Sequence, residues 1–226
     1  MTAVDTGDPG RRASAAHSLD VEEPLTPEVV PSPLSGDPLL LALPTFAVGA
    51  IGLGLYLWGY IPSGGMLAIL GIVAGLGVGA GSVWAAALGQ SAVAGILGVF
   101  SGFYVSFTVL VLGLTHGWWG INAADPANAT IVVHTQATFL IAFLVLFVAI
   151  TLTTLRLFMA FTVLMVLVDI TVVLVLLGVL NGSTGLLQAG AIGVWAFVAV
   201  GLYIWAAQMS VGTGGKPMAL GKPIIT

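Results

Sequence analysis

Residues 157–180 read LFMAFTVLMVLVDITVVLVLLGVL. Every residue in this run is apolar except two threonines, Thr162 and Thr171, and one acid, Asp169. A transmembrane α-helix needs about 20 consecutive and mostly apolar residues. The run therefore predicts a membrane-spanning helix with a carboxyl group near its centre.

Five more runs of this kind lie along the chain. The predicted spans are 39–61, 66–88, 92–114, 133–154, 157–180 and 186–208. Backbone amides in lipid must be satisfied within the segment, so the spans are expected to be helices. An outer-membrane barrel would need ten-residue segments of alternating polarity, which are absent. The predicted fold class is all-α, a polytopic membrane bundle of six transmembrane helices.

The composition supports a membrane protein and excludes several other classes. Of 226 residues, 58% are hydrophobic, 6% are charged and none is cysteine. Soluble domains carry about 25% charged residues, so a soluble enzyme, a nucleic-acid-binding protein and a disulfide-linked secreted domain are all excluded. The sequence contains no nucleotide-binding loop, HExxH motif, nucleophile elbow or carboxylate pair on two helices, so we expect no enzymatic activity and no cofactor. His116, Asp125 and His134 lack the spacing of metal ligands, so no metal site is expected.

The few charges predict the domain organisation and the orientation. Residues 1–36 are rich in acids, Pro and Ser, and are expected to form a disordered cytoplasmic tail without a signal peptide. Residues 37–208 form the predicted six-helix domain, and 209–226 a cytoplasmic C-terminal tail. With both termini inside, Arg156, Lys216 and Lys222 all face the cytoplasm, as the positive-inside rule requires. We therefore expect a multi-pass protein of the plasma or inner membrane, with N-in/C-in topology.

Several polar side chains on the predicted helices are candidates for substrate binding. Ser101, Tyr104 and Thr108 share one face of the third helix, and His134, Gln136 and Thr138 lie near the outer end of the fourth. Such hydroxyls and amides suit a small hydrogen-bonding solute. They equally suit hydrogen bonds between helices, and both readings stay open here.

Small residues predict close helix packing. Gly71, Gly75 and Gly79 follow one another at i+4 spacing on the second helix, and Gly98 and Gly102 do so on the third. Such spacing lets helix backbones approach closely in lipid. The contacts are expected either inside one subunit or between subunits.

Asp169 is the one charged residue inside a predicted membrane span, so its presence there calls for a function. A carboxylate near the bilayer centre costs about 2.5–3.5 kcal/mol on insertion scales and usually marks an ion, proton or substrate path. Asp169 is therefore the candidate for coupling transport to protons. The alternative is a structural Asp that hydrogen-bonds neighbouring hydroxyls or amides.

The stretch Asp37–Tyr60, DPLLLALPTFAVGAIGLGLYLWGY, resembles the opening helix of the acetate uptake transporter family, the succinate-acetate permease group. The family signature there is NPAPLGL, and Asp37-Pro38 takes the place of its leading Asn-Pro. Further similarities are GVFSGFY at 98–104, AGAIG at 189–193 and MALGKP at 218–223. Leu40 and Ala42 depart from the second Pro and the Gly of the signature.

The resemblance implies a homohexamer in which each protomer has its own narrow path for acetate or a similar small monocarboxylate. It implies a constriction made by Phe46, Phe100 and Met165, with Phe100 where relatives carry Tyr. It also makes Asp37 and Pro38 candidates for substrate binding. Members are described as proton-coupled carriers (symporters) or as anion channels.

The expected function is thus a transporter or channel for acetate or a similar small monocarboxylate, with proton coupling left open. Two alternatives remain at this point. One is a channel for a small neutral solute, because the candidate residues carry no fixed positive charge. The other is a membrane scaffold subunit that transports nothing.

Overall fold

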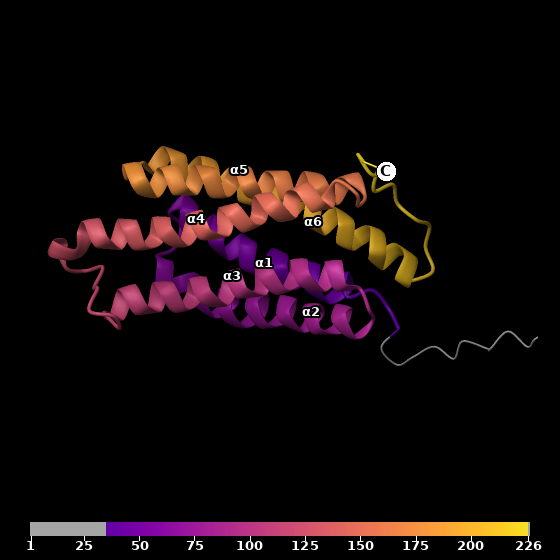
Figure 1. Ribbon diagram of the computed structural model, residues 1–226, viewed down its shortest axis with the longest axis horizontal. Coiled ribbons are helices and arrows are strands. Elements are labelled where there is room, and N and C mark those ends of the chain that lie inside the picture. Colours follow the sequence, from indigo (N-terminus) through magenta and orange to yellow (C-terminus); the bar gives the residue numbers. More distant parts are fainter. Residues whose placement is uncertain (1–34, 226) are drawn as a thin grey trace, which may run out of the picture. The chain divides into compact units, whose positions relative to one another are not determined.

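The computed structural model describes residues 35–225, and these fold into a bundle of helices (Figure 1). Six helices have the length and composition to cross a membrane, as predicted. Their bounds, with the second span divided into three parts, are α1 Leu39–Trp58, η2 Ser63–Met66, η3 Ile69–Leu76, α2 Gly77–Ala87, α3 Ser91–His116, α4 Ala129–Thr154, α5 Met159–Asn181 and α6 Thr184–Gly212. The predicted acidic tail, apart from residues 35 and 36, lies outside the described residues.

The helix ends differ from the predicted ones by a few residues. α4 begins at Ala129 rather than at 133, after the short 3-10 helix η4 (Pro126–Asn128), and α6 continues to Gly212 rather than ending at 208. The Asp125 carboxylate accepts a hydrogen bond from the backbone N–H of Ala127 at 2.9 Å and so caps η4. This capping begins the helical structure before the apolar run that marks the span in the sequence.

The second span is the least regular of the six, because η3 is a π-helix. Its glycines explain how closely it packs. A side chain at Gly71, Gly75 or Gly79 would collide with Thr108, Val105 or Ser101 of α3, at 3.0, 2.7 and 2.8 Å from the added carbon. The predicted close packing of these glycines therefore occurs within one chain. By contrast, Gly102 on α3 has no atom near enough to obstruct a side chain.

A proline inside α1 links this helix to α6. Pro44 has no N–H, so the carbonyl of Leu40 loses the donor that a helix normally supplies four residues later. The indole N–H of Trp205 on α6 donates to this carbonyl at 3.2 Å. A side chain from a distant part of the sequence thus satisfies a backbone group that Pro44 leaves unpaired.

The helices surround a hydrophobic core that contains a cluster of aromatic rings. α1 packs against α6 and against the second span, α3 packs mainly against the second span, and α4 packs mainly against α5. α3 and α4 meet only loosely along their backbones, and phenylalanine side chains from both fill the space between them. This arrangement leaves room for cavities along the inside of the bundle.

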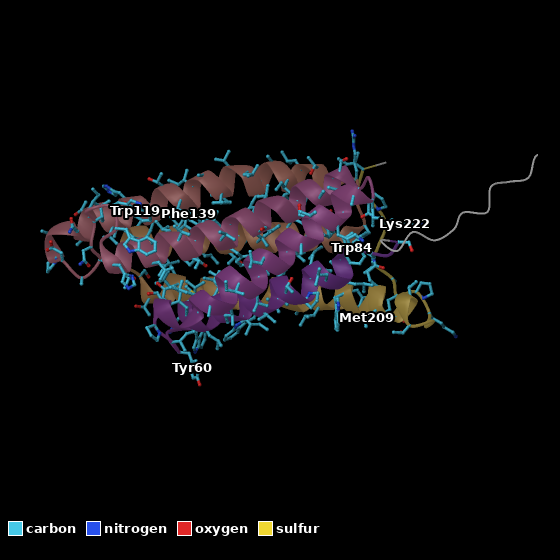
Figure 2. The ribbon with its side chains drawn as sticks, turned by 90° about the horizontal axis from the view of Figure 1, so that it is seen from below. Tyr60, Trp84, Trp119, Phe139, Met209 and Lys222 are labelled. Carbon is cyan, nitrogen blue, oxygen red and sulfur yellow. The ribbon has the colours of Figure 1, made fainter. Side chains whose placement is uncertain are left out.

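The C-terminal segment returns to the turn between α4 and α5 (Figure 1). The N–H groups of Ile224 and Ile225 donate to the carbonyl of Leu155 at 3.0 Å, and the Ala160 N–H donates to the carbonyl of Leu220 at 2.9 Å. The segment therefore lies at the same end of the bundle as Arg156. Figure 2 shows Tyr60 and Trp119 toward one end and Trp84, Met209 and Lys222 toward the other.

Candidate substrate path

A cavity of about 280 Å³ lies among α1, α3, α4, α5 and α6. It extends from the α5–α6 turn, where Gly178, Gly182 and Leu187 line it, to a group of phenylalanines within the bundle. Its other lining residues are Phe46, Leu53, Tyr56, Leu57, Phe100, Phe103, Tyr104, Phe107, Leu110, Gln136, Leu140, Phe147, Val168, Thr171, Val172, Val175, Val179 and Phe197. The wall is therefore almost entirely apolar.

A second, much smaller cavity of about 20 Å³ lies among the opposite halves of the helices. Its lining residues are Ala42, Leu43, Phe46, Val78, Ile96, Leu97, Phe100, Phe161 and Leu164. Only Phe46 and Phe100 line both cavities. These two residues, here called the constriction, separate the large cavity from the small one.

The constriction is held by aromatic contacts. The rings of Phe46 and Phe100 meet edge to face with their centroids 5.3 Å apart. Phe147 of α4 stacks on Phe100 at 4.9 Å, and Phe197 of α6 lies 5.6 Å from Phe46. Both phenylalanines of the constriction are buried, at 5% and 6% exposure. Four helices thus fix the position of the two rings.

Met165, the third residue of the implied constriction, lies at the same level on α5. It follows Leu164, which lines the small cavity, and precedes Val168, which lines the large one. Met165 is fully buried and lines neither cavity. Its side chain packs in the core around the constriction.

Four polar side chains line the large cavity, and they differ in their free hydrogen-bonding capacity. The Tyr104 hydroxyl donates to the carbonyl of Phe46 at 3.3 Å, and the Thr171 hydroxyl donates to the carbonyl of Leu167 at 2.7 Å. Among the described residues, the Gln136 amide and the Tyr56 hydroxyl have no hydrogen-bond partner. Gln136 and Tyr56 are therefore the donors available to a solute.

The other polar candidates on α3 and α4 lie away from the cavity. Ser101 donates to the carbonyl of Gly75 at 2.7 Å and so joins α3 to η3. Thr108 and Thr138 donate to carbonyls of their own helices, 2.9 and 2.8 Å away. His134 is exposed. Of the six candidates on these two helices, the structure brings Tyr104 and Gln136 together at the cavity.

Asp37 and Pro38 lie at the start of α1. The Asp37 carboxylate accepts a hydrogen bond from the N–H of Leu39 at 2.9 Å, and Pro38 is buried. A carboxylate in this position satisfies one of the free N–H groups at a helix start. Neither residue lines one of the two cavities.

Asp169 lies on α5 between two cavity-facing positions but does not line the cavity. One carboxylate oxygen, Oδ2, accepts a hydrogen bond from the Thr151 hydroxyl of α4 at 2.7 Å. The other oxygen, Oδ1, is buried and has no partner among the described residues. The side chain thus lies between α4 and α5.

Among the lining residues of the large cavity that sequence reasoning overlooked, two are polar, Tyr56 and Thr171, and two contact the constriction, Phe147 and Phe197. A signal for Phe147 was present, because Phe139, Phe143 and Phe147 recur at i+4 spacing and form one aromatic row on α4. No comparable pattern marks Tyr56, Thr171 or Phe197. Their place at the cavity depends on how the helices pack.

Within residues 35–225, no group of His, Asp or Glu side chains could hold a metal ion. His116 instead places its Nδ1 2.9 Å from the carbonyl of Leu112, one turn earlier in the same helix.

The family model of the GPR1/FUN34/yaaH family matches residues 22–214. The chain belongs to this family. The match covers all six membrane-spanning helices and leaves out only residues 215–225 of the described chain, and it confirms the resemblance to the acetate uptake transporters. No curated protein matches the sequence.

A solved structure described as that of the bacterial acetate channel SatP has the same fold. It superposes with a TM-score of 0.70 at 16% sequence identity, covering 82% of this chain and 99% of that chain. Together with the six apolar helices, the family identifies a multi-pass membrane protein.

Proposed function

We propose that the protein is a transporter or channel for acetate or a similar small monocarboxylate, with a path inside each chain. The observation that carries this proposal is the pair of cavities separated by Phe46 and Phe100. A solute entering near the α5–α6 turn would pass the large cavity, the constriction and the small cavity in that order. The family and the acetate channel of the same fold support transport rather than catalysis.

The size of the large cavity suits a small solute. Sites for drug-sized ligands occupy about 300–1,000 Å³, and this cavity, at about 280 Å³, lies just below that range. The small cavity, at about 20 Å³, has room for about one water molecule. A passing solute therefore has to displace the phenylalanine rings or lose most of its hydration.

The chemistry of the cavity suits a carboxylic acid with a short apolar chain. The Gln136 amide and the Tyr56 hydroxyl can donate to the carboxylate oxygens, while the methyl group of acetate packs against phenyl rings. Since no basic side chain lines the cavity, a proton that travels with the carboxylate would remove the charge at the constriction. Asp169 stays the candidate for such coupling, although it lies beside the cavity and acts on it only through other residues.

The proposed setting is the plasma or inner membrane, with both termini in the cytoplasm. The return of the C-terminal segment to the α4–α5 turn supports this orientation, because it gathers Arg156, Lys216 and Lys222 at one end. We propose a homohexamer of independent paths, as the resemblance implies.

The test is uptake of radiolabelled acetate into proteoliposomes, with and without a pH gradient. We expect uptake above that of protein-free liposomes. If an inward proton gradient drives accumulation, the protein is a proton-coupled carrier. If acetate only equilibrates, the protein is a channel. Absence of protein-dependent uptake would overturn the proposal.

A channel for a small neutral solute is the second candidate. It is favoured by one observation, the lack of any charged side chain in the cavity wall. The same liposomes distinguish it, because such a channel would release a neutral solute such as glycerol while excluding acetate at a pH where acetate is ionised.

A further inference from the structure

Asp169 is the one charged residue within the six described helices, and the path proposed above does not touch it. The preceding residue, Val168, lines the large cavity, whereas Asp169 is directed toward α4. The other charged residues of the membrane domain lie outside the helices: Asp37 precedes α1, and Asp125 and Arg156 lie in links between helices. Asp169 therefore has no ion pair within the described helices.

The side chain that meets Asp169 also meets the backbone of a cavity residue. The Thr151 hydroxyl lies 2.7 Å from Asp169 Oδ2 and 3.0 Å from the backbone carbonyl of Phe147, one turn earlier in α4. The Thr151 hydroxyl carries one proton, which these two acceptors share in a three-centre hydrogen bond. Thr151 thus joins Asp169 of α5 to the turn of α4 that carries Phe147.

Phe147 connects this turn to the constriction. It is 1% exposed, lines the large cavity and stacks on Phe100. α4 is held mainly by α5 and meets the α3 backbone only loosely. The position of Phe147 against Phe100 therefore depends on how α5 holds α4.

We propose that Asp169 is a positioning residue for the constriction, which through Thr151 fixes α4 so that Phe147 supports Phe100. This inference rests on the proposed function for its effect on transport. Lipid supplies no hydrophobic drive for helix association, so a hydrogen bond to a carboxylate is a strong local restraint between α4 and α5. We therefore expect the ratio in which the path passes small carboxylates of different size to depend on that restraint.

A second hydrogen bond between the same helices provides a matched control. The Thr162 hydroxyl of α5 donates to the carbonyl of Thr154 at 2.8 Å, and Thr162 is 3% exposed. This bond lies near the α4–α5 turn, two turns of α4 from Phe147. Thr162→Val removes an α4–α5 bond of the same kind without changing the one that reaches Phe147.

The experiment combines a spectroscopic and a transport measurement on the full chain in lipid. 4-Fluorophenylalanine at position 147 reports its surroundings by ¹⁹F NMR, and proteoliposomes give the ratio of acetate to butyrate uptake. Asp169→Leu and Thr151→Val are expected to shift the ¹⁹F resonance and change the uptake ratio by roughly threefold to tenfold. The double variant, with both Asp169→Leu and Thr151→Val, is expected to change the resonance and the uptake ratio no further than either single variant. Asp169→Asn, which keeps an oxygen acceptor for Thr151, is expected to keep the wild-type ¹⁹F resonance and uptake ratio.

The inference is overturned if Thr151→Val leaves the resonance at position 147 unchanged, or if Thr162→Val shifts it equally. If Asp169→Leu fails to fold, Thr151→Val and Asp169→Asn still test whether Asp169 and Thr151 position Phe147. A wild type without acetate uptake would contradict the proposed function alone, because the ¹⁹F measurement tests the Asp169–Thr151–Phe147 connection without transport.

Discussion

At the scale of single residues, the structure separates polar groups that already bond to backbone carbonyls from those that face a solute. Ser101, Thr108 and Thr138 have their hydroxyl protons on backbone carbonyls. Gln136 is the cavity residue whose side-chain amide has no partner within the described chain. All four are uncharged polar residues within apolar helices, so the packing is needed to distinguish them.

Gln136→Leu is expected to reduce acetate uptake by about tenfold, because it keeps the approximate size of the side chain but removes both amide donors. Gln136→Asn is expected to retain part of the uptake. Thr138→Val is the control, since Thr138 lies on the same helix, is exposed and does not line the cavity. Initial rates in proteoliposomes measure the effect. Wild-type rates in Gln136→Leu would remove this residue from the path.

At the scale of elements, the hydrogen bond between α1 and α6 depends on the backbone N–H that Pro44 lacks. Trp205→Phe leaves the Leu40 carbonyl without its indole partner, and we expect it to lower stability by about 1 kcal/mol. Pro44→Ala restores an N–H that can bond to Leu40. The cost of Trp205→Phe should therefore be smaller in the Pro44→Ala background.

Thermal unfolding in detergent of the wild type, Trp205→Phe, Pro44→Ala and the double variant measures the coupling between Trp205 and Pro44. An equal loss of stability in both backgrounds would show that Trp205 contributes by packing alone. The double-mutant comparison is needed because Trp205 also packs against the core.

The helices themselves could be predicted from the sequence, because apolar runs of sufficient length have one stable form in lipid. All six spans were predicted to within a few residues at most ends. The 3-10 and π-helical parts of the second span could not be predicted, since the apolar run there does not differ from that of an α-helix; the π-helical part η3 lies where glycines bring it against α3. The beginning of α4 was missed because α4 continues directly from η4, the short helix that Asp125 caps.

The candidate site was only partly predictable from the sequence, because the packing of the helices decides which residues line the cavities. Phe46 and Phe100 came from the family resemblance, and the structure places both between the two cavities. Tyr56, Thr171 and Phe197 lie on α1, α5 and α6, and no local sequence pattern marks any of them. Asp169 stood out in the sequence by its charge, but only the packing shows that Thr151 lies between it and the cavity wall.

At the scale of the whole molecule, orientation in the membrane can be tested directly, because the natural sequence has no cysteine. Ala127→Cys in the link before α4 and Met218→Cys in the C-terminal segment place single thiols at exposed positions. A membrane-impermeant maleimide applied to intact cells is expected to label Ala127→Cys only. Met218→Cys should react only after the membrane is permeabilised. The reverse pattern would invert the proposed topology.

The central claim is that acetate crosses the membrane inside a single chain, past Phe46 and Phe100. The most direct measurement is acetate uptake by Phe100→Cys before and after reaction with benzyl methanethiosulfonate, with the extent of reaction verified by mass spectrometry. Gly102→Cys is the control, since this position on α3 is exposed and no atom lies within 4 Å of the added carbon. The account predicts that the benzyl group abolishes uptake in Phe100→Cys and leaves Gly102→Cys unchanged. Undiminished uptake by fully modified Phe100→Cys would contradict it.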